Sequence, residues 1–238
     1  MVKTLILNKL LSSLFVLQTY KYISLLVLLV YSVIYSFIYI NIVHIQANIY
    51  NAYILTRTVK IEALHTGSQA TGIYIRGGYI LTVRHLYEND GGFHTSRVTL
   101  FNGRQLTPIA IYLSNNADIA IIEVTEQIVD ELKIAETPTF GKITLIGNPG
   151  DQDFEQVTTS LVPRLFIFEP ITQRIKLLPT FFCNGARPGF SGSGMFNDSN
   201  EFIGMMTLSM ASEFLCAGWS SKEIVRYVNE MKIEGLHL

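Results

Sequence analysis

The chain has 238 residues, of which 49% are hydrophobic and 16% charged, and its formal net charge is −1. These values exclude a wholly disordered chain and indicate one principal domain, or two at most. Of the 18 basic residues, three lie within the first 46 positions, which contain no acidic residue. The remainder of the chain therefore has 15 basic and 19 acidic residues. Because this remainder is mildly acidic, nucleic acid is not expected as a partner.

The first predicted element is a transmembrane helix over residues 22–45, preceded by an N-terminal segment, residues 1–21. The run from Tyr22 to Ile45 contains no Asp, Glu, Lys or Arg, and a helix of this length can cross a hydrocarbon core of roughly 30 Å. A secretory signal usually has an apolar stretch of only about 7–15 residues, so an uncleaved anchor is favoured, with cleavage near Ala47 left open. Lysines before the run favour a cytoplasmic N-terminus and an extracytoplasmic or lumenal domain after it.

An all-β domain is predicted for residues 59–238, after a linker over residues 46–58. Short β-branched runs such as Tyr79–Val83 and Ile119–Val124 alternate with turns rich in Gly, Asn, Asp and Ser. Many short strands with this spacing are typical of a sandwich or a barrel. One helix is expected after the strands, from Ser221 to Lys232, because its apolar residues share one helical face.

A glycine-flanked serine, Ser191, is the first candidate for chemistry. Gly189 and Gly192 allow a tight turn and a close approach to a ligand. The backbone amides of Gly189 and Ser191 could then stabilise a developing oxyanion. Such a string is by itself more typical of a hairpin turn. Two other segments favour a catalytic serine over a plain turn, because His85 follows a strand–turn–strand unit and Asp118 opens an apolar strand.

Four motifs occur in a consistent order along the chain: Leu81-Thr82-Val83-Arg84-His85, Asp118–Ile122, Ile146–Pro149 and Gly189–Gly194. On these motifs, the region from about Val59 to Val228 resembles trypsin-like serine peptidases of the chymotrypsin fold. The resemblance is closest to compact bacterial and viral members, including high-temperature-requirement proteases, glutamyl endopeptidases and proteases of plant RNA-virus polyproteins. It implies two antiparallel six-stranded β-barrels, with the active site between them, and a C-terminal helix.

The same resemblance implies a function for each candidate residue. Ser191 would attack a peptide carbonyl, His85 would transfer the proton, and Asp118 would orient the imidazole. The amides of Gly189 and Ser191 would form the oxyanion hole. The partner would be a polypeptide substrate, and no metal or organic cofactor would be required.

The motifs depart from the family pattern at three positions. Phe190 replaces the usual Asp or Asn before the serine, and Gly194 replaces a common Pro, which we expect to alter the shape of the loop. Arg84 stands beside His85 where many relatives have Ala. Its charge could lower the pKa of His85, or its side chain could point into solvent. Ser193 is interpreted as loop structure rather than as a nucleophile.

The specificity pocket is predicted from the resemblance alone. Its base corresponds to Gly185, and its wall to Thr207, Leu208, Ser209 and Met210. Neither an acidic residue nor a histidine occurs at these positions, so we expect a small or medium apolar residue at the cleavage site. The resemblance also suggests a disulfide between Cys183 and Cys216, with two buried free thiols as the alternative.

The sequence thus predicts a membrane-anchored serine endopeptidase. A first alternative is the same fold without activity, serving as a peptide- or protein-binding module at a membrane. A second is a β-domain that only scaffolds partners. The presence of His85, Asp118 and Ser191 together argues against the first, and the glycines of the serine loop argue against the second.

Overall fold

The computed structural model describes residues 29–35, 52–89, 91–92, 94–128, 130–150, 154–183, 187–209 and 214–238. The chain divides into two compact units, Met1–Asn51 and Ala52–Leu238. In the first unit, residues 29–35 form a helix with exposed side chains. No helix within the described ranges is both long and apolar enough to cross a membrane. Apart from residues 29–35, the predicted transmembrane helix and the N-terminal segment lie outside the described residues.

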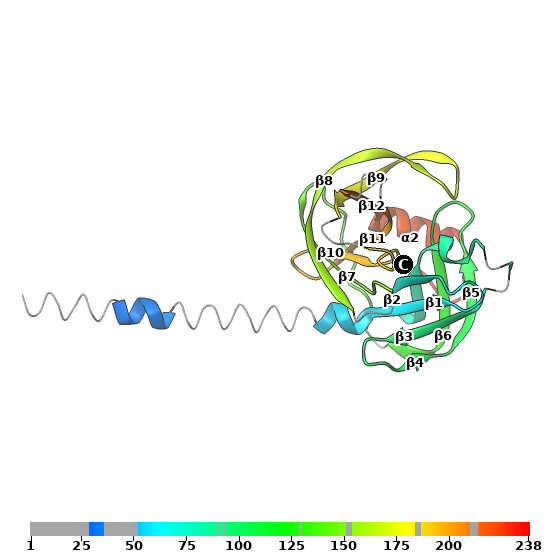
Figure 1. Cartoon of the computed structure of the whole chain (residues 1–238), viewed down its shortest axis with the longest axis horizontal. Coiled ribbons are helices and arrows are strands. Elements are labelled where there is room, and N and C mark those ends of the chain that lie inside the picture. Colours follow the sequence, from blue (N-terminus) through cyan, green and yellow to red (C-terminus); the bar gives the residue numbers. More distant parts are fainter. Residues whose placement is uncertain are drawn as a thin grey trace, which may run out of the picture. The chain divides into compact units, whose positions relative to one another are not determined.

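The second unit begins with a short helix over residues 52–57, upstream of the predicted domain start at residue 59 (Figure 1). Ile54 and Arg57 of this helix are buried. The guanidinium of Arg57 donates hydrogen bonds to the carbonyl oxygens of Asp130 and Glu131, at 3.0 and 3.3 Å. The last part of the segment interpreted as a linker is therefore packed into the compact unit.

The first six strands form one antiparallel sheet with the order β4-β3-β1-β2-β6-β5. Gly72 of β2 permits close packing of the sheet interior, since a Cβ atom there would lie 2.5 Å from the side chain of Ile61. A 3₁₀ turn, η1 (Arg84–Tyr87), follows β2 and carries His85. The strands are β1 (Thr58–Ala63), β2 (Gln69–Thr82), β3 (Ser96–Leu100), β4 (Gln105–Leu106), β5 (Pro108–Leu113) and β6 (Ala120–Ile128).

The last six strands close into a barrel with the order β10-β11-β12-β9-β8-β7. Helix α2 (Ser221–Glu230) follows directly, with Ser220 and Glu223 forming a capping box that satisfies amides at its first turn. The all-β, chymotrypsin-like fold with two six-stranded barrels and a C-terminal helix is confirmed. The strands are β7 (Gly141–Gly147), β8 (Glu155–Glu169), β9 (Arg174–Phe182), β10 (Gly194–Phe196), β11 (Phe202–Ser209) and β12 (Leu215–Ser220).

Two apolar clusters hold these parts together. The larger fills the first sheet and continues through Phe196, Met205 and Trp219 to α2. The smaller lies inside the second barrel and includes Phe190, the residue before Ser191. The serine loop is therefore attached to the core by a large buried side chain, and its position is set by packing rather than by the loop alone.

Candidate active site

His85 and Asp118 are brought together by the pairing of β2 and β6. Thr82 lies opposite Ala120 in this ladder, so the residues after β2 and before β6 share one edge of the sheet. His85 Nδ1 lies 2.7 Å from Asp118 Oδ2, and the His85 amide donates to Asp118 Oδ1 at 2.8 Å. The His85 side chain is 39% exposed and that of Asp118 only 5%. A buried carboxylate thus fixes the orientation of a solvent-accessible imidazole.

Asp118 accepts a third hydrogen bond, in addition to the two from His85, and its donor belongs to the second barrel. The hydroxyl of Thr207, on β11, donates to Asp118 Oδ2. Thr207 was expected in the wall of the specificity pocket, but its side chain is buried and points to this carboxylate. The side chains of Leu208 and Ser209, which end β11, lie outside the described residues, as do Met210 and Gly185.

The environment of His85 favours its protonated form. Burial acts to lower the pKa of His85, but the hydrogen bond and the charge of Asp118, with smaller effects of Glu88 and Glu169, raise it above 6.5. The net shift of this pKa is upward, opposite to the lowering that the sequence left open for Arg84. Its guanidinium Nη1 donates to the carbonyl oxygen of Ser114 at 2.5 Å and so holds the loop before Asp118.

The serine loop begins with a tight turn. The Phe190 amide donates to the carbonyl oxygen of Arg187 at 3.0 Å, with Pro188 and Gly189 between them. Gly189 has a φ of +100°, the conformation that a type II turn needs at its third residue. A Cβ atom there would lie 2.1 Å from the carbonyl oxygen of Asn148. Both the backbone conformation of Gly189 and this lack of space therefore exclude a side chain. Among the hydrogen bonds of the described residues, none uses the amide of Gly189 or Ser191 as donor.

One residue that the sequence did not single out, Thr71 of β2, joins the first sheet to the serine loop. Its hydroxyl donates to the Gly189 carbonyl oxygen at 2.7 Å and accepts from the Asn148 amide at 3.0 Å. Its amide donates to the Ser191 carbonyl oxygen at 2.8 Å, and its own carbonyl accepts from the Thr82 hydroxyl at 2.8 Å. Thr71 is fully buried. It therefore positions both candidate oxyanion donors relative to the strand that leads to His85.

The other residues of the serine motif are packed inside. Phe190 is buried, and Gly147 leaves room for its ring, since a Cβ atom at Gly147 would lie 2.4 Å from it. Ser193 is also fully buried, whereas Ser191 is half-buried. Within the described residues, no hydrogen bond joins Ser191 to the His85 ring. The structure thus brings His85 and Asp118 into contact and attaches the Ser191 loop to the strand before His85.

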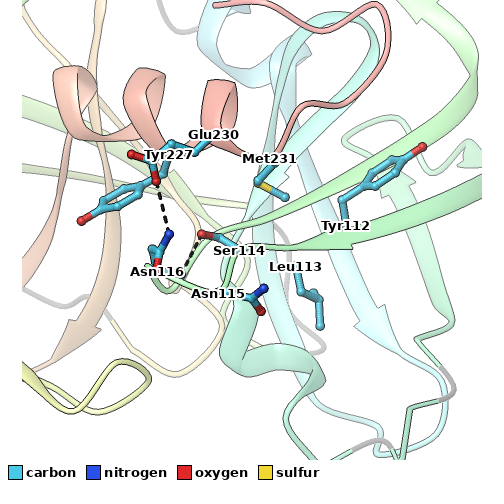
Figure 2. Close-up of a pocket in the computed structure, with 8 residues that line it drawn as sticks. All are labelled: Tyr112, Leu113, Ser114, Asn115, Asn116, Tyr227, Glu230 and Met231. Atoms are coloured by element: carbon cyan, nitrogen blue, oxygen red, sulfur yellow. Dashed lines mark hydrogen bonds between the residues drawn. The ribbon is translucent and has the colours of Figure 1, made fainter.

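Two cavities flank this arrangement. One, of about 450 Å³, adjoins η1 and is lined by Arg84 and Glu88, next to His85. The other, of about 280 Å³, lies between the 114–116 loop and α2, and Figure 2 shows the Asn116 side chain directed toward Glu230. The side-chain Nδ2 of Asn116 donates to Glu230 Oε2 at 3.3 Å. Across the described ranges, no cluster of three or more His, Cys, Asp or Glu residues could hold a metal ion.

Cys183 and Cys216 form a disulfide, with their Cα atoms 5.2 Å apart. Cys183 directly follows β9, Cys216 lies on β12, and these two strands pair at Phe182 and Leu215. Both cysteines lie in the apolar cluster that also holds Phe190. The bridge therefore reinforces the part of the second barrel from which the serine loop emerges.

Comparison with known proteins supports the family and the fold. The family model of the trypsin-like peptidase domain matches residues 70–205. The active form of the Rv3671c protease from M. tuberculosis is 15% identical, with a TM-score of 0.67 over 79% of this chain and 86% of that one. The serine endoprotease from Yersinia pestis is 19% identical, with a TM-score of 0.61 over 79% of this chain and 67% of that one. Deg5 is 16% identical, with a TM-score of 0.62 over 79% and 97%. No curated protein sequence matches the chain.

Proposed function

Because the chain belongs to the trypsin-like peptidase family, we propose that it is a membrane-anchored serine endopeptidase acting through His85, Asp118 and Ser191. Its substrate is a polypeptide, and its catalytic domain lies outside the cytoplasm or in a lumen. The observation that carries the proposal is the buried Asp118 carboxylate bonded to the ring and amide of His85. The serine loop, whose Gly189 and Ser191 amides donate to no acceptor among the described residues, lies against the same strand, β2.

The proposed reaction follows from this geometry. His85 accepts the Ser191 proton as Ser191 attacks the scissile carbonyl, and then donates that proton to the leaving amine. Asp118 keeps the Nδ1 proton on the imidazole and stabilises its cation, which agrees with the raised pKa of His85. The amides of Gly189 and Ser191 stabilise the oxyanion of the tetrahedral intermediate. Water then releases the acyl group from Ser191 by the same proton transfers.

A fluorophosphonate probe tests this assignment, because it reacts only with a serine whose proton can be removed. We expect the full chain to be labelled and the Ser191→Ala and His85→Ala variants to remain unlabelled. Ser193→Ala is the matched control, because this neighbouring serine is buried and is expected to leave labelling unchanged. A folded parent chain that is not labelled would contradict the enzyme assignment. If Ser193→Ala alone lost labelling, the nucleophile would be Ser193 rather than Ser191.

The anchor is tested separately from the chemistry. We expect the full chain to stay with the membrane pellet after alkaline carbonate extraction, and a chain lacking residues 22–45 to be released. The motivating feature is the uncharged run from Tyr22 to Ile45. Release of the full chain by carbonate would reject the anchor and leave the peptidase assignment intact.

The proposed specificity is for a small or medium apolar residue before the cleaved bond. It is based on the absence of charged side chains from positions 185 and 207–210 of the sequence. Cleavage of a peptide library should therefore be dominated by residues such as Ala, Val or Leu at this position. A profile dominated by Arg, Lys or Glu would overturn it.

A second candidate function is a peptide-binding module without catalysis. It is favoured by one observation, that no hydrogen bond among the described residues joins Ser191 to His85. Hydrogen bonds of this kind often tighten only when substrate binds, so the observation does not outweigh the His85–Asp118 pair. A binding module would retain an unlabelled peptide without cleaving it, which mass spectrometry of the recovered peptide distinguishes.

A further inference from the structure

The outer part of the β8–β9 hairpin buries two charged side chains beside Ile167 and exposes four apolar ones. Strands with one face on a protein normally turn apolar residues inward and polar residues outward. Here Glu169 is fully buried and the Lys176 side chain is only 15% exposed. The opposite face carries Phe166, Phe168, Ile175 and Leu177, which are 78%, 58%, 69% and 42% exposed. Figure 1 shows the paired strands as a long ribbon arching over the outside of the domain.

These four outward residues, called here the apolar strip, form one continuous surface. Phe166 lies opposite Leu177, and Phe168 lies opposite Ile175 in the antiparallel ladder. Residues two apart on a strand share a face, so the two cross-strand pairs are adjacent. A strip of two aromatic and two aliphatic side chains is much larger than the isolated exposed apolar residue that soluble surfaces normally show.

The inward face fixes the strip in its outward position. Lys176 Nζ donates to the carbonyl oxygen of Asn116 at 2.7 Å and lies 4.5 Å from the centre of the Trp219 ring. Glu169 accepts hydrogen bonds from the amides of Ile171 and Thr172, both at 2.9 Å. Turning the strip inward requires a shift of one residue in register, which would move both charged groups into solvent and break these contacts.

The accessible charge within the outer hairpin is positive. Its charged residues, between Leu161 and Leu178, are Arg164, Glu169, Arg174 and Lys176. Of these, Arg164 is half-exposed, and Arg174 is exposed at the end of the hairpin, opposite Glu169 in the ladder and so on the other face from the strip. The chain after residue 46 is otherwise acidic, with 19 acidic and 15 basic residues. Aromatic and aliphatic side chains with an arginine nearby are the composition that favours the boundary between acyl chains and anionic headgroups.

We propose that the apolar strip inserts into the interfacial region of a lipid bilayer, with Arg164 at the headgroups. The proposal takes only the proximity of a membrane from the proposed anchor, and it is independent of peptidase activity. The predicted span ends at residue 45 and the compact unit begins at Ala52, so the six residues between them reach at most about 20 Å when fully extended. A domain held this close to a bilayer meets it at high effective concentration.

Lipid contact can be measured with tryptophan variants of the full chain in phosphatidylcholine vesicles that contain phosphatidylglycerol and brominated acyl chains. Phe166→Trp reports on the strip, and Ile109→Trp is the matched control, because Ile109 is 59% exposed on β5 of the first sheet. Trp219 is buried and contributes equally to both. We expect bromine quenching of the Phe166→Trp signal to exceed that of the control by at least about twofold. Equal quenching of the two variants would overturn the proposal.

Further outcomes separate lipid from other occupants and from the proposed function. A blue-shifted Phe166→Trp signal without quenching, together with cross-linked dimers, would assign the strip to a second copy of the chain and reject lipid contact. Combined Phe166→Asp and Phe168→Asp substitutions should abolish the quenching difference, measured with Ile175→Trp, without lowering the melting temperature, since both side chains are exposed. Fluorophosphonate labelling in the same vesicles reports the active site independently. If carbonate extracts the chain, the anchor fails, and protein added to preformed vesicles still tests the strip.

Discussion

The ammonium group of Lys176 lies 2.7 Å from the carbonyl oxygen of Asn116, two residues before Asp118. The same group lies over the Trp219 ring and 3.9 Å from the buried Glu169 carboxylate. A cation from the β8–β9 hairpin therefore holds the loop that presents Asp118 to His85. Arg84 holds the same loop from the other side, at Ser114.

Replacing Lys176 is expected to slow the reaction at the active site, although Lys176 is not one of the proposed catalytic residues. In Lys176→Met, the Asn116 carbonyl loses its hydrogen bond from Lys176 and Glu169 loses a neighbouring cation, and small displacements of catalytic groups are costly. We predict that fluorophosphonate labelling slows by about tenfold and that Lys176→Arg restores most of the rate. The pH midpoint of labelling should also fall, because His85 is then less well aligned with Asp118. A lower melting temperature with an unchanged rate and midpoint would show a purely structural contact.

The raised pKa of His85 sets the pH dependence of activity. Neutral imidazole is the base, so labelling should rise with pH through a midpoint above 6.5. In Asp118→Asn the main influences that raise this pKa are lost while burial still lowers it, so the midpoint should move down. The conservative control is Asp198→Asn, an exposed carboxylate on a turn of the second barrel. An identical midpoint in Asp118→Asn and in the parent chain would contradict this account.

A rise in pH has the opposite effect on stability: it increases labelling but removes the contribution of His85 to the free energy of unfolding. A group whose pKa is raised by folding stabilises the native state below its unfolded value, and this contribution is lost as pH rises through the folded value. We therefore expect the parent chain to lose stability relative to His85→Ala as pH rises from 6 to 8. Denaturant unfolding of both proteins across this range measures the free energy of unfolding of the parent chain minus that of His85→Ala. This difference should become smaller as pH rises.

Thr71 should prove sensitive to substitution although it is not a proposed catalytic residue. Thr71→Val keeps the shape of the side chain but leaves the buried Gly189 carbonyl and Asn148 amide without their partner. An unsatisfied buried polar group costs about 1–3 kcal/mol, so we predict labelling at least about tenfold slower. Thr71→Ser retains the hydroxyl and should label at nearly the parent rate. If Thr71→Val and Thr71→Ser behave alike, the hydroxyl does not position the serine loop.

These contacts also show which parts of the site could be predicted. His85 and Asp118 stand at the ends of strands whose local patterns are clear, and β2 and β6 pair as neighbours, so their meeting follows from the fold. Thr71 could not be found in this way. Its hydroxyl partners lie 77 and 118 residues away, and threonine is an ordinary strand residue.

The β8–β9 hairpin shows the same limit for the fold. The apolar runs Val157–Val162 and Leu165–Phe168 of the sequence predict two short strands, whereas β8 runs without interruption from Glu155 to Glu169. Its outward apolar face depends on Lys176 reaching Asn116, a contact across 60 residues of sequence. Alternation along a strand predicts that one face differs from the other, but it does not identify which face the protein covers.

The Cys183–Cys216 disulfide gives the last prediction. It closes a loop of 33 residues that contains Ser191, and crosslinks of this length stabilise a fold by about 2–4 kcal/mol, mainly by restricting the unfolded chain. The Cys183→Ala, Cys216→Ala double variant should therefore unfold at lower denaturant concentration by this free energy. Reductant should shift the parent chain in the same direction and leave the double variant unchanged. Since both sulfurs lie in the cluster with Phe190, we also expect slower labelling of Ser191. Equal midpoints for the parent chain with and without reductant, at full thiol titration, would contradict the stabilising role.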